Sequence, residues 1–280
     1  MKLLGLDIGG TNIRVGLVED NKLVRVESVR VNKNGSSDEI LADVLNLVRK
    51  FDLSDVKGIG AGVPSVVDVE KGIIYDVTNI PSWKEVHMKE IFEKEFKVPV
   101  FINNDANCFA CGEKYFGKAK QYRDIIGLIT GTGLGAGIIV NNKLYAGNNC
   151  GAGEFGMVRY KDSNYESYCS GQFFTSVYKI SGEELSRRAA EKDREALKIY
   201  EEYGRNLGEA VKMVLYTIDP QIIILGGSVS QAFPYYKDSL WKTLQDCVYP
   251  KSVARLQIDV SELQHSAILG AAALCYDAGE

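Results

Sequence analysis

The sequence predicts an α/β protein built from two related halves with a cleft between them. Short apolar runs typical of strands alternate with segments whose apolar residues recur at helical spacing. Each half opens with an apolar strand, a turn rich in glycine and threonine, and another strand. The first turn is Gly9-Gly10-Thr11 and the second is Gly131-Thr132-Gly133. This repetition indicates a duplicated architecture, and 280 residues are enough for two modest domains.

The first half is expected to begin with an antiparallel meander. Its three apolar runs are joined by tight turns and cover residues 3–8, 13–18 and 24–31. Ser36 and Glu39 form a capping box, and apolar residues then recur at helical spacing, which predicts a helix over 37–51. The other elements expected here are a strand at 57–63 that ends before Pro64, a helix over 85–96, a strand at 99–103 and a helix over 105–116.

The second half repeats the pattern of strand, turn and strand. Its first two strands are expected at 125–131 and 137–147, and the second of them contains an Asn-Asn turn. A long helix over 193–217 ends before Asp219-Pro220, because proline cannot continue a helix. The elements expected after it are a buried strand at 221–227, a helix over 234–248, a strand within 255–263 and a C-terminal helix rich in small residues from Ser266.

Composition and charge argue against several classes of protein. The chain carries 33 Lys and Arg and 37 Asp and Glu, a formal net charge of -4, and so lacks the basic excess typical of nucleic-acid binding. The apolar stretch at the N-terminus ends at Asp7 without a small-residue cleavage site, so it does not resemble a signal peptide. No run approaches the roughly 18 apolar residues of a spanning helix. A cytoplasmic protein without a membrane or nucleic-acid partner is expected.

The six cysteines are scattered without the spacing of a disulfide framework, which indicates reduced thiols. Cys108 and Cys111 form a CxxC pair. A zinc ribbon would need a second such pair or nearby histidines, and the only histidines are His87 and His265. We therefore interpret Cys108 and Cys111 as packing thiols on a helix.

The first glycine turn follows a carboxylate at the end of a strand. Asp7 directly precedes the turn Gly9-Gly10-Thr11-Asn12, whose backbone can bring several N–H groups close to an anion. A carboxylate beside phosphate repels it unless a divalent cation lies between them, so the pairing implies Mg²⁺ held by Asp7 through water. The alternative is an ordinary turn in which Asp7 accepts hydrogen bonds from turn amides.

The second glycine cluster contains GxGxxA but does not fit a dinucleotide-binding fingerprint. That fingerprint needs a helix after the turn, whereas the residues after Gly137 favour a strand with a hairpin signal. A second strand-turn-strand cradle is expected instead, with Thr132 and Gly133 at its centre. The chain also lacks the P-loop motif. A third glycine pair, Gly226-Gly227, would let a flat ligand such as adenine approach the backbone.

Two carboxylates are candidates for chemistry between and beside the cradles. Asp105 lies at a strand end and helix start, where it is either an N-cap or a general base. A hydroxyl that attacks a nucleotide's phosphate needs an acceptor for its proton, which favours the base. Glu154, in a glycine-rich loop, suits binding of sugar hydroxyls, and the alternative is an ordinary loop charge.

These motifs, in order, resemble those of the actin-like ATPase superfamily and more closely the ROK family of bacterial sugar kinases and repressors. The matching segments are LGLDIGGTNIRVGLV, NNDANCFACGE, GLITGTGLGAGIIVNNKLYAG and IIILGGSVS, and the likeness runs from residue 3 to about 275. The resemblance implies two actin-like (ribonuclease H-like) domains that close on ATP and a hexose. We expect these domains at 1–116, with the helix 266–280 packing back onto it, and at 117–265.

The resemblance also implies an activity and an assembly. ROK repressors carry a helix-turn-helix ahead of the first phosphate motif, which begins here at residue 3, so the kinase branch is favoured. The implied reaction is transfer of the γ-phosphoryl group of ATP to a hexose or hexose derivative, usually to its 6-hydroxyl. The implied partners are the sugar, ATP and Mg²⁺, and relatives are commonly dimers or tetramers. The alternatives are a catalytically weak sugar-sensing protein and a nucleotide-hydrolysing activator.

Carried over by position, the resemblance assigns roles to individual residues. Asp105 becomes the base that takes a proton from the sugar hydroxyl. Thr132 and Gly133 would face the phosphates, and Gly226 and Gly227 the adenosine. The residues implied to bind sugar are Asn104, Glu154, Pro64, Ser65, Asn79 and Thr175.

Two departures from the family pattern bear on the sugar. Met157 stands where most members have a histidine that touches both sugar and zinc, and Thr175 takes the place of a sugar-binding glutamate. The cysteine-rich zinc loop is missing as well, so no structural zinc is expected. A thioether makes no useful hydrogen bond to a hydroxyl, so the preferred pattern of hydroxyls should differ from that of glucose-specific members.

Overall fold

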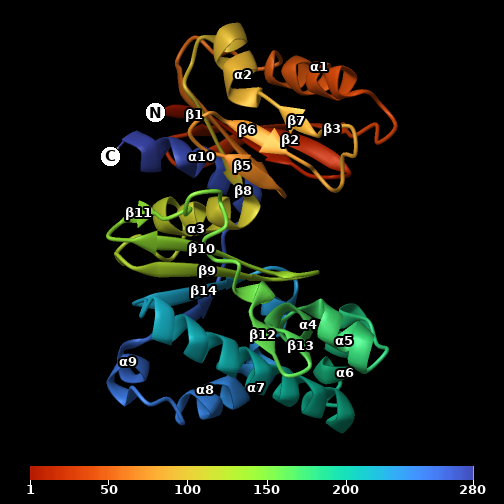
Figure 1. Ribbon diagram of the computed structural model, residues 1–280, viewed down its shortest axis with the longest axis vertical. Helices are drawn as coiled ribbons and strands as arrows, with labels where there is room; N and C mark the ends of the chain where they lie inside the picture. Colours follow the sequence, from red (N-terminus) through yellow and green to blue (C-terminus); the bar gives the residue numbers. More distant parts are fainter. Residues whose placement is uncertain (280) are drawn as a thin grey trace. The chain divides into compact units, whose positions relative to one another are not determined.

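The computed structural model describes residues 1–279 and has the mixed α/β architecture that the sequence predicts. The chain falls into two compact units (Figure 1). Unit 1 consists of Met1–Gln121, Lys143–Ala152 and the chain from Glu262 onward, and unit 2 consists of Tyr122–Asn142 and Gly153–Ser261. The domain boundaries at 116 and 265 stay a prediction, whereas the units place the loop 143–152 with unit 1.

The sheet of unit 1 has the strand order β3-β2-β1-β4-β8. Its strands are β1 (Lys2–Ile8), β2 (Asn12–Glu19), β3 (Lys22–Arg30), β4 (Val56–Val63) and β8 (Val100–Asn104). The first three are antiparallel and confirm the predicted meander, and β4 and β8 run parallel to β1. Asp20 and Asn21 both adopt positive φ, which is the backbone of a tight hairpin turn between β2 and β3.

Helices cover both faces of this sheet. They are α1 (Ser37–Val48), α2 (Met88–Phe96), α3 (Asp105–Tyr115) and α10 (Ser266–Gly279). The predicted capping box starts α1, since Ser36 accepts from the N–H of Glu39 and the Glu39 carboxylate accepts from the N–H of Ser36. The buried residues Ile40 and Val44 of α1 pack on one face, together with Leu4 and other sheet residues, and α10 packs on the opposite face (Figure 1).

Three short strands near residues 66–86 were not expected. They are β5 (Val66–Asp68), β6 (Ile73–Tyr75) and β7 (Glu85–Val86), which form a small antiparallel sheet. The predicted helix over 85–96 therefore begins only at Met88. Its first two residues pair with Ile74 and Tyr75 instead, because a ladder of backbone hydrogen bonds is available to them there.

Glycines allow α10 to lie directly on the sheet of unit 1. A Cβ atom at Gly5 of β1 would lie 2.0 Å from the carbonyl oxygen of Ile268, and one at Gly60 of β4 would lie 1.8 Å from that of Ala271. Gly112 of α3 faces Gly270 of α10 in the same way, with 3.0 Å between its added Cβ and the Gly270 Cα. The small residues of the C-terminal helix thus serve close backbone packing.

The sheet of unit 2 repeats the strand pattern of unit 1, with the order β11-β10-β9-β14-β15. Its strands within unit 2 are β9 (Ile125–Thr130), β10 (Leu134–Val140), β14 (Ile222–Gly226) and β15 (Gln257–Val260). The edge strand β11 (Lys143–Leu144) belongs to the segment Lys143–Ala152, which is grouped with unit 1. The strand predicted over 137–147 begins earlier, at Leu134, and breaks at the hairpin turn Asn141-Asn142, where both residues adopt positive φ. The second glycine turn is therefore short.

Unit 2 contains a long helix together with several shorter helices and short strands. The predicted long helix is α7 (Arg194–Thr217), followed by α8 (Phe233–Leu244) and α9 (Pro250–Arg255). Gly204 and Gly208 of α7 bring it against α8, since added Cβ atoms would lie 2.0 Å from Ser239 Oγ and 2.7 Å from Thr243 Cβ. The elements that the sequence did not predict are η1 (Phe155–Met157), β12 (Arg159–Tyr160), β13 (Ser163–Asn164), α4 (Tyr165–Cys169), α5 (Gly171–Val177), α6 (Gly182–Ala190), η2 (Val229–Ala232) and α9.

Both Cys108 and Cys111 are buried on α3, as their interpretation as packing thiols predicts. Burial raises the pKa of each thiol well above its ordinary value, so both are protonated at neutral pH. None of the helices within residues 1–279 has the length and apolar character needed to traverse a lipid bilayer.

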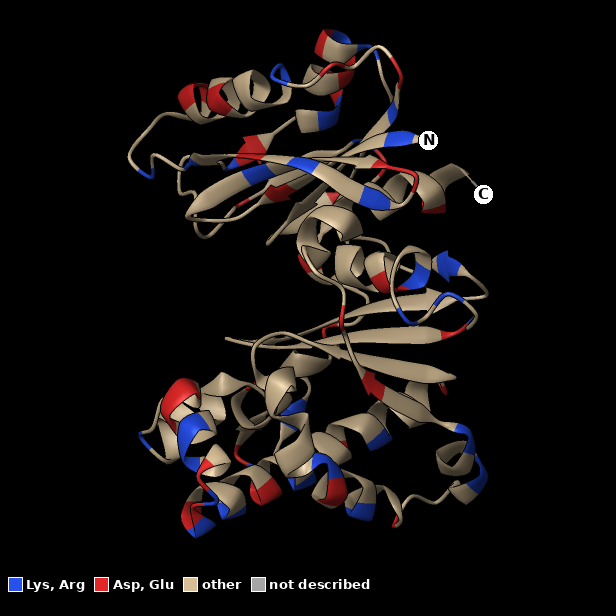
Figure 2. Cartoon of the chain, turned by 180° about the vertical axis from the view of Figure 1, so that it is seen from behind, with Lys and Arg blue, Asp and Glu red and all other residues tan. Residues whose placement is uncertain are grey.

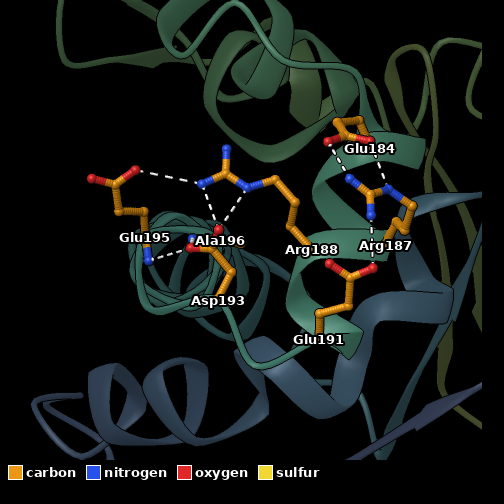
Figure 3. Close-up of polar contacts among 7 residues, drawn as sticks. All are labelled: Glu184, Arg187, Arg188, Glu191, Asp193, Glu195 and Ala196. Atoms are coloured by element: carbon orange, nitrogen blue, oxygen red, sulfur yellow. Dashed lines mark hydrogen bonds and ion pairs between the residues drawn. The ribbon is translucent and has the colours of Figure 1, made fainter.

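Acidic and basic side chains are mixed along the helices of both units (Figure 2), in keeping with the nearly balanced composition. One network joins the end of α6 to the start of α7 (Figure 3). Arg188 pairs with the Asp193 carboxylate at 2.7 Å, and Asp193 caps α7 by accepting from the N–H groups of Glu195 and Ala196 at 2.8 and 3.2 Å. Arg187 pairs separately with Glu184 within α6.

We expect Asp193→Ala to lower the melting temperature by about 2–4 °C, the effect of losing one helix cap in a protein of this size. Arg188 and the capped amides lower the pKa of Asp193, so its stabilising effect is present at neutral pH and is lost as the pH falls through that depressed pKa. Thermal melts at pH 7 and in acid measure the effect. Glu184→Gln, which removes only an exposed pair, is the control and should change the melting temperature less.

Candidate functional site

The carboxyl ends of three neighbouring strands of unit 1 bring the predicted residues together. Asp7 of β1 lies opposite Gly62 of β4, and Gly62 lies opposite Asn103 of β8. The residues that follow β4 and β8 therefore lie at the same edge of the sheet as Asp7, and they include Ser65 and Asp105. Ligands of open α/β sheets commonly bind outside this edge.

Asp105 is not the cap of α3. Asn104 takes that role, because its Oδ1 accepts from the N–H of Asn107 at 2.8 Å, so the capping interpretation of Asp105 is wrong. The Asp105 carboxylate accepts from the N–H of Ala106 at 2.9 Å and remains exposed to solvent. Within residues 1–279, the side-chain N–H₂ group of Asn104 forms no hydrogen bond, so it can donate at the same edge.

Asp7 and Asp105 affect each other electrostatically. Burial raises the pKa of Asp105 above its ordinary value, the Ala106 N–H opposes this, and the negative charge of Asp7 adds to it. Burial also raises the pKa of Asp7, against the attraction of Arg14, whose guanidinium lies 3.9 Å from Asp7. Part of the Asp105 side chain is exposed to solvent. Protein atoms nevertheless surround much of its carboxyl group, and this partial desolvation is enough to raise its pKa.

The first glycine turn leaves two donors unused. The N–H of Gly9 donates to the carbonyl of Asn12 at 3.1 Å, and the carbonyl of Thr11 accepts from Val31 at 2.9 Å. Among residues 1–279, neither Gly10 nor Thr11 has a hydrogen-bond partner for its N–H. A Cβ at Gly10 would lie 2.1 Å from the Cβ of Asn79, so the structure places the predicted sugar-side residue Asn79 against this turn.

The loop after β4 is held by the small sheet of unit 1. The N–H of Ser65 donates to the carbonyl of Val63 at 2.9 Å, and its hydroxyl donates to the carbonyl of Tyr75. The Pro64-Ser65 corner is thus fixed at the carboxyl edge. A cavity of about 690 Å³ lies beside the strand that follows, and Val67, Asp68, Tyr75 and Asn148 are among the residues that line it.

The second glycine turn, in unit 2, also closes on itself, although its closing hydrogen bond spans one residue fewer than that of the first turn. The N–H of Gly131 donates to the carbonyl of Gly133 at 3.0 Å. The N–H of Leu134 donates to Glu166 Oε2 at 3.1 Å, and the carbonyl of Gly131 accepts from the N–H of Gly171 at 2.7 Å. Within the part of the chain that the structure describes, the N–H groups of Thr132 and Gly133 form no hydrogen bond, so two adjacent donors are available here as well.

A cavity of about 600 Å³ opens beside this turn, with all of its lining in unit 2. The lining includes Thr132, Thr175, Glu183, Tyr200, Val229 and Gln231. Of the predicted nucleotide residues in this unit, Thr132 lines the cavity. Gly227 shapes the adjoining backbone, because its φ is +83° and a Cβ there would lie 2.4 Å from the carbonyl oxygen of Thr130.

Thr175 and Glu154, both implied to bind sugar, lie in different parts of unit 2. Thr175 is on α5 beside the cavity, and its hydroxyl donates to the carbonyl of Gln172 at 3.2 Å. Glu154 is exposed just before η1, and Met157 at the end of η1 is 54% exposed. A Cβ at Gly156 between them would lie 2.5 Å from the carbonyl oxygen of Leu134, so this loop lies against the start of β10.

Glu166 is the carboxylate that sequence reasoning missed. It lies on α4 and reaches the second glycine turn, where a Cβ at Gly133 would lie 2.5 Å from its Oε2 atom. Glu183, Tyr200 and Gln231 in the cavity were missed too. The available signal was the acidic residue in Tyr-Glu-Ser-Tyr just before Ser170-Gly171, a cap followed by glycine, but the distance in sequence from the turn hides the contact.

The acidic groups of unit 1 fit Mg²⁺ better than a metal held by protein ligands alone. Mg²⁺ is commonly held by one or two carboxylates together with phosphate oxygens and waters, and Asp7 offers a desolvated carboxylate next to two unused N–H donors. Among residues 1–279, no three His, Cys, Asp or Glu side chains are grouped so that they could hold a metal ion.

Two sheets with the same strand pattern, each with a glycine turn between an antiparallel pair of strands, define the two-domain actin-like ATPase fold. The family model of the ROK family matches residues 3–278. The chain therefore belongs to the ROK family.

The relatives include kinases and a repressor. The chain is 30% identical to the glucokinase of Thermotoga maritima, covering 98% of this chain and 97% of that one. It is 27% identical to the xylose repressor of Bacillus subtilis, covering 98% and 77%. A solved structure, a ROK family glucokinase from Streptomyces griseus in complex with glucose and AMPPNP, matches with 26% identity and a TM-score of 0.77, covering 98% of this chain and 99% of that one.

Proposed function

We propose that this protein is an ATP-dependent sugar kinase that transfers the γ-phosphoryl group to a hydroxyl of a hexose or hexose derivative, the 6-hydroxyl by family resemblance. The observation that carries the proposal is the pairing of Asp105 with Asp7 at one sheet edge, beside a turn with two unused N–H donors. The kinase relatives, one solved with glucose and AMPPNP, support it.

In the proposed reaction, Asp105 accepts the proton of the attacking sugar hydroxyl. Its raised pKa makes it a better proton acceptor than an ordinary aspartate. Asn104 and Glu154 orient the sugar. In each unit by itself, the free N–H groups of the glycine turn, at Gly10 and Thr11 and at Thr132 and Gly133, are donors suited to phosphate oxygens, whose negative charge they would stabilise.

Asp7 is the residue proposed to hold Mg²⁺ through water. When bound, the ion neutralises phosphate charge, which allows ATP to lie near two carboxylates. When no ion is bound, the Arg14 guanidinium, 3.9 Å from the Asp7 carboxylate, partly offsets the negative charge of Asp7. Adenosine is assigned to the 600 Å³ cavity of unit 2, beside Thr132 and Gly226-Gly227.

The test is the initial rate of ADP release with a panel of sugars. The panel contains glucose, mannose, fructose, allose and the N-acetylhexosamines, each with ATP and Mg²⁺. At least one sugar should raise ADP release well above the rate without sugar. Sugar-independent rates throughout the panel would contradict the proposal.

The rate should fall in mild acid. Because the pKa of Asp105 is raised, protonation of this base begins at a higher pH than for an ordinary aspartate, whose pKa is about 3.9. kcat therefore decreases as the pH falls through the raised pKa, and it is constant above it. A pH profile of kcat at saturating sugar and ATP measures this decrease. A profile that stays flat down to about pH 4 would contradict the role of Asp105 as base.

A sugar-sensing or regulatory protein is the second candidate. The xylose repressor relative favours it, and so does the exposed thioether of Met157, which makes no useful hydrogen bond to a sugar hydroxyl. Calorimetry separates the two functions. A sensor binds sugar without ATP turnover, whereas a kinase that binds the same sugar converts ATP to ADP in its presence.

A further inference from the structure

Three contacts from α4 and α5 hold the second glycine turn in unit 2. The N–H of Gly171 donates to the carbonyl of Gly131 at 2.7 Å. Gln172 Nε2 donates to the carbonyl of Thr132 at 3.1 Å, and Glu166 Oε2 accepts from the N–H of Leu134 at 3.1 Å. The turn is therefore fixed from one side by groups that lie more than 30 positions away in sequence.

Gln172 joins two of these contacts. Its side-chain amide carries two protons, and the second is donated to Glu166 Oε1 at 3.1 Å. One amide thus binds both the carbonyl of Thr132 and the carboxylate that holds Leu134. An amide that donates both protons to fixed acceptors has a single orientation, which rigidifies the groups it connects.

The contacts within the second glycine turn and with α4 determine which of its N–H groups stay free for a ligand. The N–H of Gly131 is used within the turn and that of Leu134 is used by Glu166, so only Thr132 and Gly133 keep free donors. Thr132 also lines the 600 Å³ cavity, as does Gln172 itself. If the Thr132 carbonyl lost its partner, the peptide planes of the turn could rotate and the two donors would no longer point in a fixed direction.

We propose that Gln172 is a positioning residue for phosphoryl transfer, which holds the turn from Gly131 to Leu134 so that the N–H groups of Thr132 and Gly133 meet the phosphates of the donor nucleotide. The inference rests on the proposed function because it requires that ATP bind at the second glycine turn. It predicts that Gln172 affects the binding of phosphates and leaves the binding of the nucleoside unchanged.

The experiment compares AMPPNP with adenosine as calorimetric probes of the full chain, with Mg²⁺ present. Gln172→Met keeps the length of the side chain and removes both donors. We expect it to weaken AMPPNP binding about tenfold, the effect of losing a fixed hydrogen bond to a charged ligand, and to change adenosine binding less than twofold. Ser176→Ala, on the same helix and exposed, is the control and should bind both ligands as the wild type does.

A second variant tests whether replacing the hydrogen bonds of Gln172 by electrostatic repulsion weakens AMPPNP binding further. Gln172→Glu has the same shape, cannot donate to the carbonyl of Thr132 and places a negative charge beside Glu166. It should weaken AMPPNP binding more than Gln172→Met does. Melting temperatures of both variants show whether the fold is retained, and Gln172→Glu serves as the test if Gln172→Met does not fold.

The outcomes separate the inference from the proposed function. If the wild type binds AMPPNP and the folded variants bind it equally well, or if they lose AMPPNP and adenosine binding to the same extent, Gln172 has no positioning role. If the wild type binds no AMPPNP, the proposed function fails and the inference fails with it. Selective loss of AMPPNP binding supports both.

Discussion

Asp105→Asn is expected to reduce sugar-dependent ADP release by about 10²–10⁴-fold, the usual contribution of a positioned general base. Asparagine has nearly the same shape and can still accept from the Ala106 N–H, whose donor distance is 2.9 Å, so the start of α3 should be preserved. What is lost is the ability to take the proton of the attacking hydroxyl. Coupled-assay rates at saturating sugar and ATP measure the loss.

Sugar and nucleotide binding provide the control for this variant. Both should stay within a few-fold of the wild type, because neutralising Asp105 removes a charge that repels Asp7 and phosphate alike. The cap of α3 belongs to Asn104, so the melting temperature should also be unchanged or higher. Undiminished turnover in Asp105→Asn would remove this residue from the catalytic role.

The second large effect concerns stability. Gly60→Ala should destabilise unit 1 by roughly 3 kcal/mol, because the new Cβ would lie 1.8 Å from the carbonyl oxygen of Ala271 and 2.6 Å from its carbonyl carbon. Backbone atoms of α10 cannot move aside as a flexible side chain does, so the helix must shift away from β4. The expected fall in melting temperature is about 6–12 °C.

Gly151→Ala is the matched control, since nothing lies within 4 Å of a Cβ at Gly151. The same glycine-to-alanine change should then be neutral or slightly stabilising, because it restricts the unfolded chain without a clash. Equal melting temperatures for Gly60→Ala and the wild type would show that α10 does not pack on β4 as closely as described.

Elements with strong local signals could be predicted from the sequence. The meander of β1, β2 and β3 follows from alternation and tight turns, and the capping box at Ser36 marks the start of α1. The repeated glycine turns indicated the duplicated strand pattern. In each case the residues that determine the structure are neighbours in sequence.

The elements between residues 155 and 190 could not be predicted, because their stability comes from distant contacts. Helix α4 has five residues, too few to form alone, and the buried Tyr203 of α7 donates to the carbonyl of Cys169 at its end. The carboxylate of Glu166 acquires its position at the glycine turn only through this packing. Sequence spacing gives no indication of such a contact.

The candidate site was predictable in part for the same reason. Asp7 lies near the carboxyl end of β1 and Asp105 directly follows β8, so the shared edge of the sheet places both residues there independently of the loop conformations. Thr175 was chosen by its position in a motif, and the structure places it beside the cavity that Thr132 lines. Ligands chosen from loops, including Glu154 and Ser65, depend on loop geometry and stay predictions.

The most direct measurement of the central claim is ³¹P NMR of the full chain with ATP, Mg²⁺ and the sugar that best stimulates ADP release. A sugar kinase should form ADP and a sugar phosphate in equal amounts, with the phosphate on a sugar hydroxyl and none released free. The account is contradicted if ATP yields inorganic phosphate, or if ATP stays intact with every sugar of the panel.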